Sequence, residues 1–137
     1  MAHYLTPHEA LIYTMITMSG VDRDISDTEL KRIGTLVKNL PVFAEFDVND
    51  LTKVASNCGS ALGEQDGLAS VLSAIANALP EKLKETAYAL AVEVAIIDRV
   101  IEKEEIRFLQ MLRDKLELDK LTTAAIEHGA RARHRRV

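Results

Sequence analysis

The sequence is poor in the residues that build sheets, disulfides and membrane spans. It has no Trp, three Tyr, three Phe and a single Cys among 137 residues. Because sheets draw on aromatic and β-branched side chains, this composition favours helices. One cysteine cannot form an internal disulfide, which indicates a reducing compartment. The longest apolar run, residues 87–97, contains Glu93 and is too short to cross a bilayer.

Charge and hydropathy are those of an ordinary globular protein. Hydrophobic residues make up 47% of the chain, charged residues 28%, and the net charge is −4. This mild acidity gives no reason to expect nucleic acid as a partner. The first nine residues lack the basic-then-apolar layout of a secretory signal. We therefore expect a cytoplasmic protein without a membrane span, in which residues 1–137 form a single domain.

Apolar residues recur at helical spacing in seven segments, and no segment alternates as a strand would. Capping-box patterns, Thr6 with Glu9 and Ser26 with Glu29, mark the first two helix starts, and Pro41 ends the second helix. The predicted helices cover residues 7–20, 27–40, about 49–62, 68–79, 80–97, a segment through 106–116, and a segment from 119 or 120 onward. The sequence thus predicts an all-α, compact seven-helix bundle.

The chain also repeats itself. Residues 9–40 align with residues 85–116, and seven of the 32 aligned pairs are identical. Four identities fall in one window with the pattern Asp-Arg-x-Ile-x-x-x-Glu, which starts at Asp22 in the first copy and at Asp98 in the second. Repetition in a small helical protein predicts pseudo-two-fold packing of two units, here about residues 6–40 and 82–116.

Each window connects two helices, and its acidic residues have two interpretations. As capping residues, Glu29 and Glu105 would bind the free amides of a helix start, and the Asp residues would form turns. Alternatively, Asp22, Glu29, Asp98 and Glu105 converge on Mg²⁺ or Ca²⁺, which prefer oxygen ligands. Both interpretations stay open. The isoleucine of each window is expected to enter the core.

Glu93 is the fifth candidate ligand, since it interrupts the most apolar predicted helix. A buried carboxylate is costly unless it is paired or protonated, so a cation is one explanation. The alternative is that Glu93 lies on a narrow solvent-facing stripe.

The duplicated pattern resembles that of the tellurite-resistance TerB-like family, Asp-Gly-x-Ile-x-x-x-Glu between helices. Asp22, Ile25 and Glu29 match the first copy, and Asp98, Ile101 and Glu105 match the second. Arginine replaces the family's glycine after each Asp and places a countercharge beside it. The resemblance implies an all-helical fold, a part in stress and metal-oxyanion resistance, and a cation site at the acidic residues.

We therefore predict a non-enzymatic, intracellular stress-response or scaffold module that binds a divalent cation or an unidentified protein partner. A metal-free interaction module is the alternative. A third possibility is an enzyme with a carboxylate-bound metal at Asp22, Glu93, Asp98 and Glu105, although no nucleophile motif or catalytic histidine pattern accompanies these acids.

The remaining chemistry-bearing residues favour structural interpretations. Cys58 sits on an apolar row of its predicted helix, as an inert core thiol would. The basic residues 131–136 either contact an acidic partner, an anionic membrane surface or nucleic acid, or complement a helix C-terminus. The sequence favours the last of these.

Overall fold

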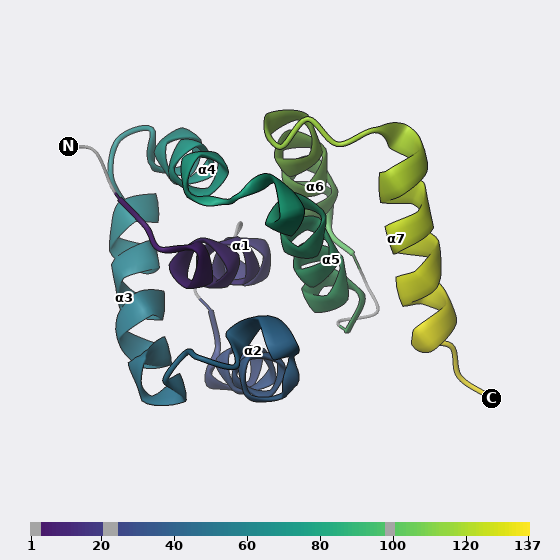
Figure 1. The fold of residues 1–137 in the computed structure, drawn as a ribbon, viewed down its shortest axis with the longest axis horizontal. Coiled ribbons are helices and arrows are strands. Elements are labelled where there is room, and N and C mark those ends of the chain that lie inside the picture. Colours follow the sequence, from purple (N-terminus) through teal and green to yellow (C-terminus); the bar gives the residue numbers. More distant parts are fainter. Residues whose placement is uncertain (1–3, 21–24, 98–100) are drawn as a thin grey trace.

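A computed structural model describes residues 4–20, 25–97 and 101–137 of the chain. These residues form seven α-helices and two short 3₁₀-helices, without any strand (Figure 1). The α-helices are α1 Pro7–Gly20, α2 Asp27–Asn39, α3 Leu51–Leu62, α4 Gly67–Ala78, α5 Glu81–Ile97, α6 Lys103–Lys115 and α7 Lys120–Arg133, and the 3₁₀-helices are η1 Pro41–Phe43 and η2 Val48–Asp50. The predicted all-α, seven-helix fold is confirmed.

Local sequence determines where the first helices begin. The amide of Thr6 donates to Glu9 Oε1 at 2.8 Å, and the amide of Glu9 donates to Thr6 Oγ1 at 3.1 Å. Ser26 and Glu29 exchange the same two bonds at the start of α2, both at 3.1 Å. Both predicted capping boxes are confirmed, and each satisfies amides that have no partner inside the helix.

Helix α1 lies at the centre of the bundle, where it packs against α2, α3, α4, α5 and α6 (Figure 1). Every residue from Ala10 to Ser19 is buried, so this helix has no solvent-facing side. Its polar side chains are accommodated locally. For example, the hydroxyl of Thr14 donates to the carbonyl of Ala10 at 2.8 Å. A helix that is apolar on all sides is typical of a core element.

The helices pack in the same order in both halves. In the first half α2 and α3 both contact α1, and in the second half α6 and α7 both contact α5. Helices α1 and α5 pack against each other, and α4 joins the halves through contacts with α1, α3 and α6. The pseudo-two-fold symmetry itself stays a prediction.

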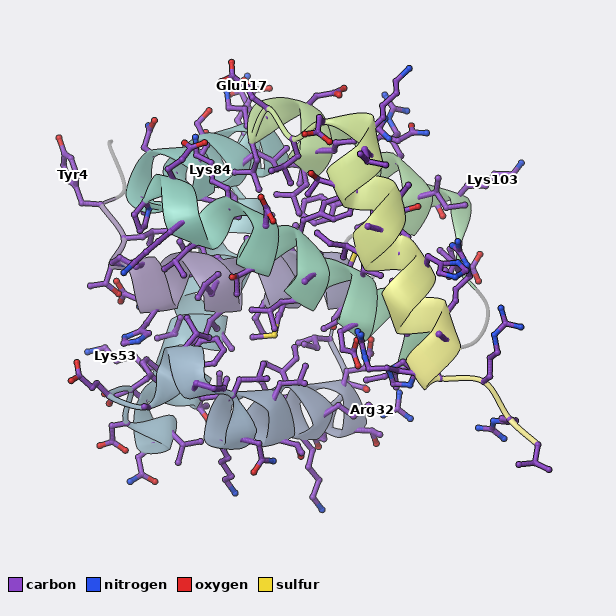
Figure 2. All side chains as sticks on the ribbon, turned by 45° about the vertical axis from the view of Figure 1, so that its right-hand side comes forward. Tyr4, Arg32, Lys53, Lys84, Lys103 and Glu117 are labelled. Atoms are coloured by element: carbon purple, nitrogen blue, oxygen red, sulfur yellow. The ribbon has the colours of Figure 1, made fainter. Side chains whose placement is uncertain are left out.

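Most charged side chains lie at the surface, and Glu29 and Glu105 are the buried exceptions among the described residues. Figure 2 shows Lys53 and Lys103 at the periphery of the bundle. In the described ranges no helix is both long enough and apolar enough to cross a membrane.

Candidate functional site

The five acidic candidates separate into two groups. Glu29, Glu93 and Glu105 belong to described helices, whereas Asp22 and Asp98 lie outside the described residues. Among the residues that the structure describes, no group of three or more His, Cys, Asp or Glu side chains is placed to hold a metal ion. Convergence of Asp22, Glu29, Asp98 and Glu105 on a cation therefore stays a prediction, as does the role of Glu93 as a ligand.

Glu29 and Glu105 cap helices. The carboxylate of Glu29 accepts the amide of Ser26 at 3.1 Å, and that of Glu105 accepts the amide of Glu102 at 2.9 Å. Both side chains are buried, at 8% and 7% exposure. The capping interpretation is confirmed for both residues, and one oxygen of each carboxylate is engaged at the first turn of α2 or α6.

Glu93 pairs with the end of α7. Its Oε2 accepts a bond from Arg133 Nη2 at 2.8 Å, and its Oε1 lies 2.5 Å from His134 Nε2. Burial alone would raise the pKa of Glu93, but the bonds to Arg133 and His134 outweigh it and lower that pKa. The side chain of Glu93 is 19% exposed, so its carboxylate is partly buried and paired with the end of α7. Its partners lie 40 and 41 residues away in sequence.

The two motif isoleucines differ in their surroundings. Ile25 is partly buried and packs against the core. Ile101, its counterpart, is 39% exposed, and Ile106 on α6 is 47% exposed. The prediction that the isoleucine of each window enters the core is therefore wrong for Ile101. Its side chain lines a surface cavity.

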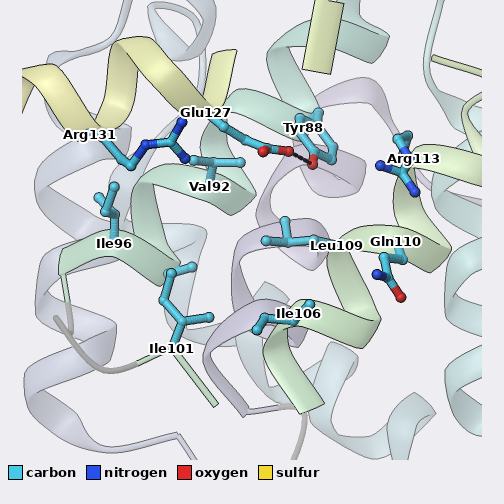
Figure 3. A pocket seen from close by; sticks show the side chains of 11 residues that line it. Tyr88, Val92, Ile96, Ile101, Ile106, Leu109, Gln110, Arg113, Glu127 and Arg131 are labelled. Carbon is cyan, nitrogen blue, oxygen red and sulfur yellow. Dashed lines mark hydrogen bonds between the residues drawn. The ribbon is translucent and has the colours of Figure 1, made fainter. Parts of the chain in front are cut away.

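This cavity has a volume of about 260 Å³ and lies where α5, α6 and α7 meet (Figure 3). We call it the C-terminal groove. Its aliphatic lining comes from α5, α6 and the segment before α6: Val92, Ala95, Ile96, Ile101, Ile106 and Leu109. Concave, largely apolar surfaces with a few polar groups are typical of binding sites.

Polar side chains form one edge of the C-terminal groove. The hydroxyl of Tyr88 on α5 donates to Glu127 Oε2 on α7 at 2.5 Å. Burial of the ring, and then the bond to Glu127, raise the pKa of Tyr88. Arg131 and Arg113 lie on either side of this pair, at opposite ends of the row (Figure 3). The carboxylate inside the groove is thus engaged by a neutral hydroxyl rather than by either arginine.

A second cavity occupies the corresponding place in the first half. Its lining residues include four that the sequence repeat pairs with those of the C-terminal groove: Ile16 with Val92, Gly20 with Ile96, Ile25 with Ile101, and Leu30 with Ile106. This N-terminal groove measures about 900 Å³, and those of its lining residues that the structure describes are uncharged. The sequence reasoning missed both grooves, although the paired aliphatic residues around each window are visible in the repeat.

A family model described as Tellurite resistance protein TerB matches residues 8–128 of the chain. No curated protein and no solved structure matches it significantly. The matched residues run from α1 into α7 and include both copies of the acidic window. The chain therefore belongs to the tellurite-resistance TerB family.

Proposed function

We propose that this chain is a non-enzymatic, intracellular stress-response scaffold of the TerB type that works by binding another protein. The observation that carries the proposal is the C-terminal groove, in which Ile101 and Ile106 keep 39% and 47% of their surface exposed. Exposed aliphatic side chains in a concave surface favour docking, because covering them removes apolar area from water. The stress-response role is supported by the family description.

The scaffold function is tested by capture of partners from a lysate of the source cells, with a chelator present. Ile106→Glu places a charge in the groove at a position that is already half exposed. Leu121→Glu is the matched control, since Leu121 is 82% exposed and is not among the lining residues of the groove. We expect the captured proteins to be lost with Ile106→Glu and retained with Leu121→Glu. Retention of the same proteins by both variants would contradict the proposal.

A second candidate function is binding of Mg²⁺ or Ca²⁺ by the duplicated acidic loops. It is supported by the two buried carboxylates, Glu29 and Glu105, which follow Asp22 and Asp98 at the same spacing. Calorimetry of the chelator-stripped protein tests it, with the Asp22→Asn/Asp98→Asn double variant as control. Saturable heat that disappears in the double variant would support a cation site. Absence of heat would leave these residues as caps and turn formers.

A carboxylate-metal enzyme is supported less well than either candidate. Glu93 is one of the four ligands of this enzyme hypothesis, and both of its carboxylate oxygens already bind Arg133 and His134. A cation would have to displace these bonds to bind Glu93. Cation-dependent turnover that Asp98→Ala abolishes would reverse this ranking.

A further inference from the structure

We propose that the C-terminal groove binds an amphipathic helix whose apolar face is flanked by acidic side chains. This inference rests on the proposed scaffold function and names the chemistry of the partner. Two properties of the groove carry it, its aliphatic floor and the two arginines at its ends.

The aliphatic floor determines the apolar face of the partner. Val92 and Ile96 lie one helical turn apart on α5, and Ile106 and Leu109 lie one turn apart on α6. The two pairs of side chains line a common cavity, and residues of α7 form its third wall (Figure 3). A surface built from helical ridges accepts another helix, whose side chains at intervals of three and four residues fit between them.

The arginines determine the charge of the partner. Arg131 has no ion-pair partner within the described ranges, and Arg113 has only its neighbour Asp114, at 3.9 Å. That aspartate is 79% exposed, so solvent screens the pair strongly. Glu127 is engaged by Tyr88 and does not neutralise either arginine by a direct bond. With the carboxylate of Glu127 between the two arginines, this edge of the groove keeps a net positive charge. A net positive edge beside an apolar floor is complementary to acidic residues that flank an apolar face.

The placement of the arginines favours a helix over an acyl chain. Arg131 and Arg113 stand at opposite ends of the polar row and do not converge on one point (Figure 3). A fatty acid presents a single carboxylate to one of them, whereas an acidic helix presents several along its length. An acidic helix can therefore interact with Arg113 and Arg131 at the same time.

Among the residues that the structure describes, the two grooves differ in the wall that faces the aliphatic floor. The floor of the N-terminal groove repeats three of the four paired aliphatic positions, with Gly20 in place of Ile96. Its facing wall carries Thr52 and Ser56 of α3.

The test uses two synthetic helical peptides with the same leucine face, one flanked by glutamates and one by lysines. Fluorescence anisotropy at low salt measures the affinity of the full chain for each. We expect the glutamate peptide to bind about tenfold more tightly, with a preference that fades as salt rises. The Arg113→Glu/Arg131→Glu variant should reverse the preference and bind the lysine peptide more tightly.

Arg135→Glu/Arg136→Glu is the matched control, because it changes the net charge equally but lies in the segment after α7. We expect this variant to keep the preference of the unmodified chain. Equal affinity for both peptides, binding of neither, or an equal effect of both charge reversals would overturn the proposal. Saturable binding of dodecanoate without binding of the glutamate peptide would assign the groove to an acyl chain and overturn it as well. If lysate capture depends on Ile106 while both peptides fail, the scaffold function stands and this partner chemistry falls.

Discussion

At the scale of single residues, one glycine allows the turn between α3 and α4. A Cβ atom built on Gly67 would lie 2.5 Å from the carbonyl oxygen of Ala61 and 2.7 Å from the carbonyl carbon of Leu62. Both atoms belong to the backbone, so neither can rotate away. The preceding residue, Asp66, has a φ of 56°, which turns the chain sharply into α4. Only a residue without a side chain therefore fits at position 67.

We expect Gly67→Ala to lower the free energy of unfolding by about 1–3 kcal/mol, because the backbone must shift to admit the methyl group. Gly59→Ala is the control, since a Cβ at Gly59 in α3 meets no atom within 4 Å. That change should raise stability by about 0.5–1 kcal/mol, as expected for glycine to alanine inside a helix. Urea denaturation of both variants measures the difference. Equal stability of the two would contradict the close packing at Gly67.

The single cysteine is a core residue, as its sequence position predicts. Cys58 is fully buried, and its Sγ lies 3.7 Å from the hydroxyl of Thr17. Burial raises the pKa of the thiol to about 11, although the bond to Thr17 lowers it slightly. We expect Ellman's reagent at pH 8 to label Cys58 at a rate set by unfolding of the protein, since the reactive thiolate is scarce and inaccessible in the fold. Labelling of the folded protein as fast as of the urea-unfolded chain would contradict this.

At the scale of helices, side-chain hydrogen bonds join α7 to α5 at two positions along α7. Tyr88 binds Glu127 near the middle of α7, and Glu93 binds Arg133 and His134 at its end. Both sets join residues about 40 positions apart. Because α7 forms one wall of the C-terminal groove, these contacts also determine the width of the groove.

We expect Glu93→Gln to lower the free energy of unfolding at pH 7 by roughly 0.2–1 kcal/mol, a modest value because Arg133 is 59% exposed. The pKa of Glu93 is lower in the fold than its usual 4.5, so the charged carboxylate stabilises the fold above that value. This contribution is lost as the pH falls below 4.5 through the folded pKa. Denaturant titrations from pH 7 to pH 3 should therefore show the variant and the unmodified chain converging. Glu81→Gln is the control, because Glu81 is 90% exposed in its pair with Lys84, and its effect should be smaller.

Local and long-range features differed in how far the sequence could predict them. The helix starts at Thr6 and Ser26 follow from residues within three positions, so the capping boxes and the helix boundaries were predictable. The bonds of Glu93 and the exposure of Ile101 depend on where α7 packs, which no local pattern encodes. The repeat was visible, but it predicted the same environment for Ile25 and Ile101. The structure gives the two isoleucines different environments, because Ile25 lies beside α3 and Ile101 lies beside α7.

At the scale of the whole molecule, the central position of α1 ties the helices into one packing unit. It contacts α2 and α3 of the first half, α5 and α6 of the second, and the connecting α4. No layer of solvent-exposed residues separates α1 from α5, because both helices are buried where they meet. Loss of packing at α1 should therefore lower the stability of both halves together.

We expect Met15→Ala to lower the free energy of unfolding by about 2–5 kcal/mol, since Met15 is fully buried at the middle of α1. Unfolding should remain a single transition, because the halves share this helix and neither buries its apolar face without it. Urea titrations read by circular dichroism, together with amide exchange in α3 and α7, would show coincident midpoints for the unmodified chain and for the variant. Leu121→Ala, at a position that is 82% exposed, is the control and should change stability by under about 0.5 kcal/mol. Two separate transitions, with α7 and α6 persisting after α2 and α3 have unfolded, would show instead that residues 1–137 contain two independently stable units.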